Sequence, residues 1–145
     1  MSYLVSLVVF LAGVCFTVFT SGSTTAALLY LPSFIAVGIV PFLFVSVLFG
    51  FKNMGTAFST ALKKEAEKEK AQKAVDFFKF YGKTIWVFAV IAAALGFIGM
   101  LYSLEDASQI GPKLALAVVS LLYAGIINAV IVLPFTILAK KQLAD

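Results

Sequence analysis

Two long apolar runs without a charged residue dominate the last third of the sequence. The first extends from Ile85 to Leu104 and the second from Leu114 to Ala139. Each reaches or exceeds the roughly 20 apolar residues with which a helix crosses the hydrocarbon core of a bilayer. The stretch between them, 105–113, is short and polar, as is typical of a tight turn. The sequence therefore predicts a transmembrane helical hairpin.

The rest of the chain is also unusually apolar. Hydrophobic residues make up 62% and charged residues only 12% of the 145 positions, whereas soluble domains are about half apolar. The N-terminal run lacks a basic segment before it and is long for a signal peptide, so we interpret it as a retained first helix. We expect an all-α membrane protein with four transmembrane helices, forming a single membrane domain over 1–145. The expected spans are 3–20, 26–51, 84–104 and 114–139, with a short helical cytoplasmic extension at 52–83.

The lysines indicate how the chain is oriented. All of the basic residues are lysines, and all but Lys113 lie either in 52–83 or after the last run. Loops on the cytoplasmic side of a membrane carry an excess of basic residues. We therefore expect a multi-pass protein with both termini and the 52–83 segment in the cytoplasm.

The residue types exclude several classes of function. The sequence has no histidine, a single cysteine (Cys15), and no acidic residue in any expected span. This leaves no credible metal site, no acid–base pair and no activated nucleophile. We therefore expect no enzyme activity, no cofactor and no metal. The absence of arginine and the sorting of the lysines by membrane side also argue against nucleic-acid binding.

Small residues recur on one face of each helix of the hairpin. Their spacing of three and four residues places them on a single face. Small residues allow close approach of helix backbones in lipid, which favours a packing seam. A narrow polar path with Ser120 and Asn128 as hydrogen-bonding members fits the same spacing, and the spacing does not decide between the two. The stripe consists of Ala89, Ala92, Gly96, Gly99 and Ser103 on one helix and Ala117, Ser120, Ala124 and Asn128 on the other.

The polar segment 52–83 is rich in helix-forming residues and in oppositely charged pairs such as Glu69 and Lys73. Pairs at this spacing stabilise an exposed helix, and a charge run of this kind is usually a solvated face. We expect the chain to reverse direction near 67–72.

Four short motifs occur in order along the chain: Leu31-Pro-Ser-Phe-Ile-Ala-Val-Gly38, Gly96-Phe-Ile-Gly-Met-Leu101, Ile110-Gly-Pro-Lys-Leu-Ala-Leu-Ala117, and Leu122-Tyr-Ala-Gly-Ile126 followed by Pro134. This pattern resembles helices two to four of the flagellar stator A-subunit family (MotA), within the wider MotA/TolQ/ExbB proton channel group. The large cytoplasmic domain of that family is reduced here to the segment 52–83, in which the resemblance implies Lys63, Lys64, Glu65 and Glu67 as candidate contacts with a cytoplasmic partner. In place of the family's residues the chain has Ala93 for a proline, Met100 for a threonine and Leu121 for a second hydroxyl.

The resemblance implies a function that the chain alone cannot perform. An A-type subunit of this kind forms a homo-oligomeric ring, expected to be a pentamer, in the bacterial inner membrane. The ring surrounds the helices of a single-span B-type partner that supplies a membrane aspartate. The complex would be a stator-like, proton-motive-force-driven motor, with protons favoured over sodium because oxygen ligands are few. The residues that the resemblance places at the ion path or partner helix are Ala93, Gly96, Gly99, Met100, Ser120, Ala124, Asn128 and Pro134. A non-transporting structural or assembly protein with four spans is the alternative.

Overall fold

The computed structural model describes residues 8, 12, 31–63 and 67–144, and every regular element among them is helical. Apart from Val8 and Ala12, which are helical, the expected first span and Cys15 lie outside the described residues. The elements are α3 (Leu31–Phe34), the π-helix η1 (Ile35–Ile39), α4 (Val40–Phe49), α5 (Phe51–Leu62), α6 (Lys68–Leu101), α7 (Ala107–Ile127), the π-helix η2 (Asn128–Val132) and α8 (Leu133–Ala144).

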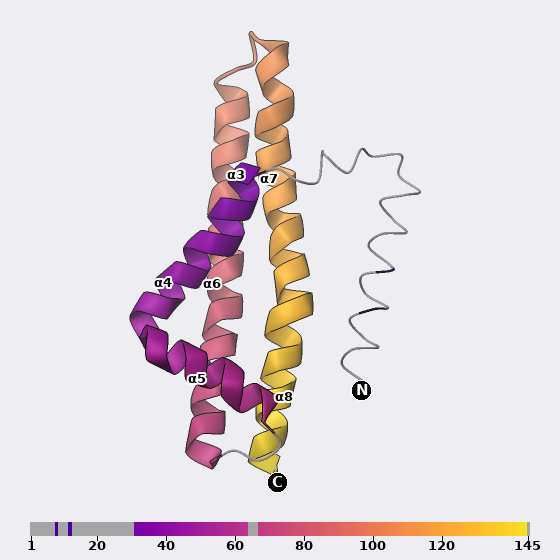
Figure 1. Cartoon of the computed structure of the whole chain (residues 1–145). Coiled ribbons are helices and arrows are strands. Elements are labelled where there is room, and N and C mark those ends of the chain that lie inside the picture. The colour runs from indigo at the N-terminus through magenta and orange to yellow at the C-terminus, as the bar shows by residue number, and fades with distance from the viewer. Residues whose placement is uncertain (1–7, 9–11, 13–30, 64–66, 145) are drawn as a thin grey trace.

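Three of the described helical runs are long and apolar enough to cross a membrane: Leu31–Phe49, Lys68–Leu101 and Ala107–Leu143. The chain is thus a multi-pass membrane protein by the length and composition of its helices. Figure 1 shows α6 and the continuous α7–α8 rod as a long antiparallel pair. The segment α3–α4 leans against this pair, and α5 then crosses α6 toward α8. The expected hairpin is present.

The turn of the hairpin is shorter than the sequence indicated. We expected it over 105–113, but α6 ends at Leu101 and α7 already begins at Ala107. Asp106 caps α7 because its carboxylate accepts a hydrogen bond from the Ser108 N–H at 3.0 Å, which satisfies a free donor at the helix start. Pro112 consequently lies inside α7 and not at its beginning.

A glycine separates the second span from the polar segment. Gly50 has φ of +81°, a backbone region that residues with a Cβ rarely adopt. It lies between α4 and α5, so the helix of the expected span 26–51 ends at Phe49. The reversal expected at 67–72 does not fall there, because α5 ends at Leu62 and α6 already begins at Lys68.

Both π-helices come just before a proline. The segment η1 ends at Ile39, before Pro41, and η2 ends at Val132, before Pro134. A proline ring clashes with the carbonyl four residues earlier and offers no N–H to it. The wider π turn gives that carbonyl room, so the helix continues past each proline.

Aromatic rings hold the lysine-rich end of the helices together. The Phe58 ring of α5 lies 5.0 Å from that of Phe78 and 5.2 Å from that of Phe135, between centroids. Phe49, at the end of α4, packs edge-on against Phe77 at 5.5 Å. Phe77 and Phe78 are almost completely buried. This cluster joins α4, α5, α6 and α8. On α6 it lies before Lys83, ahead of the uncharged part of that helix.

Candidate functional site

The small-residue stripes of α6 and α7 face each other within one chain. At Gly96, an added Cβ would lie 2.7 Å from the Lys113 carbonyl oxygen and 2.8 Å from the Ala117 nitrogen. Both of these atoms belong to the backbone of α7, so the two helices approach too closely here for any residue but glycine. Ala92, Ala93, Ala117 and Ala124 are also buried. The stripe is therefore a packing seam between α6 and α7.

Gly99 has a different neighbour. An added Cβ at this position would lie 3.3 Å from Cδ of the Lys113 side chain. The Lys113 ammonium donates a hydrogen bond to the Ser103 hydroxyl. The lysine stem thus lies over Gly99 while its charge reaches toward the hairpin turn, as long basic side chains do near the ends of spans. Met100, beside it, is half-buried.

The second span joins this seam through a serine. Ser33, completely buried in α3, donates a hydrogen bond to the Leu116 carbonyl of α7 at 3.3 Å. Near it, the Phe34 and Tyr123 rings meet edge-on at 5.9 Å. Three of the sequence motifs therefore meet at one stretch of α7, through Ser33, Gly96 and Ala117. Ser33 was not among the predicted site residues, although the Pro-Ser motif contains it.

Ser120 and Asn128 use their polar groups within their own helix. The Ser120 hydroxyl is completely buried and donates to the Leu116 carbonyl at 2.5 Å. The Asn128 amide donates to the Ala124 carbonyl at 2.9 Å. Such back-bonding satisfies a polar group inside an apolar helix. The Ser120 donor is thus used within α7, and one of the two Asn128 amide donors is used in the same way.

Asn128 nevertheless lies at a close helix contact that the sequence did not indicate. A Cβ added to Gly82 would lie 2.8 Å from the Asn128 Oδ1 and 2.7 Å from Val132 Cγ1. Gly82 is buried in α6, next to Lys83. Asn128 and Pro134 consequently lie toward the lysine-rich end of the bundle.

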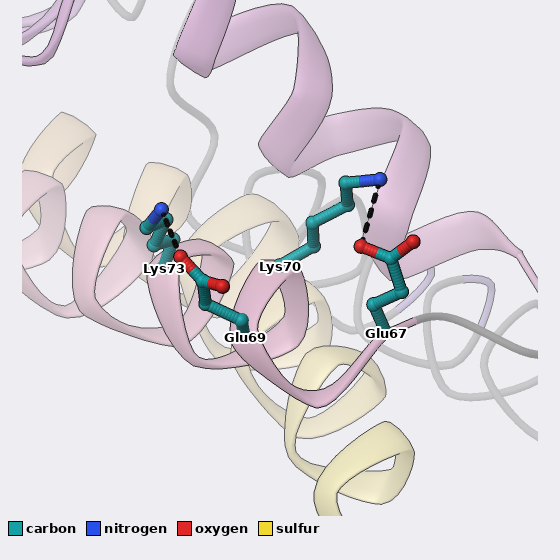
Figure 2. A network of polar contacts seen from close by, with 4 residues as sticks. All are labelled: Glu67, Glu69, Lys70 and Lys73. Carbon is teal, nitrogen blue, oxygen red and sulfur yellow. Dashed lines mark hydrogen bonds and ion pairs between the residues drawn. The ribbon is translucent and has the colours of Figure 1, made fainter.

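The candidate cytoplasmic contacts are only partly described, because Lys64 and Glu65 lie outside the described residues. Lys63 and Glu67 are both exposed. The Lys63 carbonyl accepts a hydrogen bond from the Gln142 side chain at 2.6 Å, which joins the end of α5 to α8. Glu67 pairs with Lys70 at 2.9 Å, with both side chains largely in solvent (Figure 2). Pairs this exposed contribute little to stability and leave their charges available to a partner.

The described residues contain no group of three or more histidine, cysteine, aspartate or glutamate side chains that could hold a metal ion. Comparison of the chain with protein-family models, curated proteins and solved structures gives no match.

Proposed function

We propose that this chain is the A-type, channel-forming subunit of a proton-motive-force-driven, stator-like complex. One observation carries the proposal furthest: residues from three of the motifs that resemble MotA meet in one place. Ser33 donates to the Leu116 carbonyl, and Gly96 lies against the backbone of Lys113 and Ala117. Motifs that are widely separated in the sequence are expected to converge in this way when they belong to one functional unit.

The chain's own chemistry supports a role that depends on a partner. The apolar runs from Ile85 to Leu104 and from Leu114 to Ala139 contain no carboxylate, and moving an ion across a bilayer normally requires an ionisable group at depth. In the proposed complex a single-span B-type partner supplies a membrane aspartate. This chain supplies the surrounding wall as a homo-oligomer, in our proposal a pentamer in the bacterial inner membrane with both termini cytoplasmic.

The proposed ion is the proton. The Ser120 hydroxyl is completely buried, and the Met100 and Leu121 side chains carry no oxygen, so the side-chain oxygen ligands that sodium needs are scarce. A carboxylate in an apolar environment takes up a proton readily, because desolvation disfavours its charged form. Four of the residues that the resemblance places beside the partner helix are partly exposed, and we propose that these border it: Gly99, Met100, Asn128 and Pro134. The other four, Ala93, Gly96, Ser120 and Ala124, are buried within this chain and belong to the seam between α6 and α7.

A second candidate function rests on a specific observation. The hydroxyls of Ser46, Thr84, Ser120 and Thr136 each donate to the carbonyl four residues earlier in their own helix. Side chains that satisfy themselves in this way suit a purely structural or assembly role without transport.

The two functions are distinguished by co-expression with candidate partners. The chain is expressed together with each single-span protein that has a membrane aspartate and is encoded by a neighbouring gene. Complex formation and the internal pH of the cells are then measured. The channel function predicts a stable complex and a sodium-independent proton leak that is lost when the partner's aspartate is replaced by asparagine. A leak that needs sodium would refute the choice of ion. A complete absence of such complexes would favour the structural role.

A further inference from the structure

A cavity of about 340 Å³ lies at the elbow between α4 and α5, against the first turns of α6. Its floor is apolar and consists of Ala57, Ala74 and Phe77, which are all buried. Phe49 closes it on the side of α4. The volume is in the range of small-molecule sites, which are likewise mostly apolar with a few polar groups that fix orientation.

The rim of the cavity carries charges of both signs. Lys70, Lys73 and Asp76 contribute from α6, and Asn53 contributes from α5. The three charged side chains are exposed, so their polar ends face solvent above the buried floor. A ligand that fits this rim carries an anionic and a cationic group together, because a purely anionic ligand would meet Asp76.

The lysines of the rim are held only weakly. Lys73 pairs with Glu69 at 2.6 Å and Lys70 with Glu67 at 2.9 Å, in the arrangement that Figure 2 shows. More than half of each of these four side chains is exposed. Exposed pairs of neighbouring helical residues are worth little, and each ammonium has donors left for a second acceptor. A phosphate can therefore join or replace the glutamates.

The cavity opens where the apolar surface of α4 ends. Val47 and Leu48, just before Phe49, are exposed, and so is Phe51 just after Gly50. In a membrane protein such side chains contact acyl chains, whereas Lys70 and Lys73 belong to the charged start of α6. The cavity thus lies at the boundary between the apolar and the charged parts of the bundle. A ligand there needs acyl chains as well as a polar head.

We propose that this elbow cavity binds the headgroup of a zwitterionic aminophospholipid such as phosphatidylethanolamine. The phosphate is held by Lys70 and Lys73, and the primary ammonium by the Asp76 carboxylate, which already accepts hydrogen bonds from the Gln72 amide at 3.1 and 3.2 Å. The acyl chains lie along the exposed surface of α4. The inference does not depend on the proposed channel function.

The test is native mass spectrometry of the full chain in mild detergent. Phosphatidylethanolamine, phosphatidylcholine and phosphatidylglycerol are added at equal concentration, and soluble phosphoethanolamine is added as a competitor. We expect phosphatidylethanolamine to be retained best, since a trimethylammonium group cannot donate to Asp76 and phosphatidylglycerol offers no cation. Equal retention of the three lipids would overturn the proposal. Displacement by phosphoethanolamine at concentrations comparable to those of the lipid would assign the cavity to a soluble ligand instead.

Variants with opposite expected effects identify the cavity. Replacing both lysines (Lys70→Gln with Lys73→Gln) should lower phosphatidylethanolamine retention roughly three- to tenfold, as expected for the loss of two solvent-exposed ionic contacts. Asp76→Asn should abolish the preference over phosphatidylcholine, and Glu69→Gln should raise retention because it frees Lys73. Lys79→Gln, on the same helix but outside the cavity lining, is the matched control. Equal losses in the control and the double variant, or no change in any variant, would refute the site.

Discussion

Gly96 and Gly99 provide a direct test of how α6 and α7 pack. The two glycines lie one turn apart on α6, and a Cβ at either meets a part of Lys113. At Gly96 the nearest atom, at 2.7 Å, is the Lys113 carbonyl oxygen, which cannot move unless the helices separate. At Gly99 the nearest atom, at 3.3 Å, is Cδ of the flexible lysine side chain. We therefore predict that Gly96→Ala destabilises the protein while Gly99→Ala does not.

The expected magnitude follows from these contacts. Forcing a methyl group into a well-packed contact costs about 1–3 kcal/mol, and replacing glycine by alanine inside a helix gains up to about 1 kcal/mol. The gain from replacing glycine by alanine in a helix is the same for both variants, so it cancels in the difference between their free energies of unfolding. Gly96→Ala should therefore be less stable than Gly99→Ala by about 1–3 kcal/mol, mostly from the lost approach of the two backbones.

The assay is the unfolding midpoint in mixed micelles with increasing denaturing detergent, followed by far-ultraviolet circular dichroism. Leucine variants extend the test, because Gly96→Leu should disrupt the hairpin outright, whereas Gly99→Leu must displace the Lys113 stem from Ser103. Equal midpoints for the two alanine variants, or a lower midpoint for Gly99→Ala, would show that the described contact between α6 and α7 is wrong.

Three further predictions concern the turns and the orientation. Gly50→Ala should destabilise the protein by about 1–2 kcal/mol, since φ of +81° is unfavourable for a residue with a Cβ; an unchanged unfolding midpoint would contradict this. Asp106→Ala should lower the midpoint at neutral pH, whereas Asp106→Asn should retain most of the cap. The Ser108 hydroxyl and N–H hold the pKa of Asp106 below its ordinary value. The stabilisation by the ionised Asp106 cap is therefore present above the ordinary pKa of aspartate and is lost as the pH falls through the lower pKa of the folded state. A lower unfolding midpoint for Asp106→Ala that persists at low pH would argue against the cap. With Cys15 removed, single cysteines at Gln72 and Ser108, which are both exposed, should be labelled from opposite sides of the membrane, and labelling at position 72 by an impermeant reagent in intact cells would overturn the orientation.

The hairpin and its seam were predictable because both depend on local periodicity. Two apolar runs of sufficient length define the long helices, and small residues at helical spacing define the face on which they meet. The spacing did not reveal which small residue touches backbone and which touches a side chain. Gly96 and Gly99 have the same place in the pattern, but only Gly96 lies against the α7 backbone. That distinction depends on the relative shift of two helices, which no local pattern contains.

The turns were predicted less well, for identifiable physical reasons. Gly50 lies within a long apolar run that reads as one helix, and its positive φ is a tertiary feature. The last span was placed at 114–139 because its uncharged run begins after Lys113, whereas α7 already begins at Ala107. Asp106 carried the better signal, since an aspartate is a favoured N-terminal cap. That signal was available in the sequence, but the span was defined by its uncharged run alone.

The end of the last span shows how hydropathy overestimates the length of a membrane segment. The run from Leu114 to Ala139 is apolar throughout, but Asn128 lies beside Gly82, next to Lys83 on α6. The helices are antiparallel, so the residues after Asn128 lie alongside the charged first half of α6.

Several of these later residues are apolar because they pack within the protein, although Leu133 and Ile137 are exposed. Val132 and Ala139 are buried, and the Phe135 ring stacks on that of Phe78 at 5.3 Å. Hydropathy cannot distinguish burial in an aromatic cluster from burial in a bilayer, since both remove the same surface from water. If 52–83 lies outside the bilayer core, the last span ends near Asn128. The η2–α8 segment then belongs, with α5 and the start of α6, to a helical layer at the lysine-rich surface of the membrane.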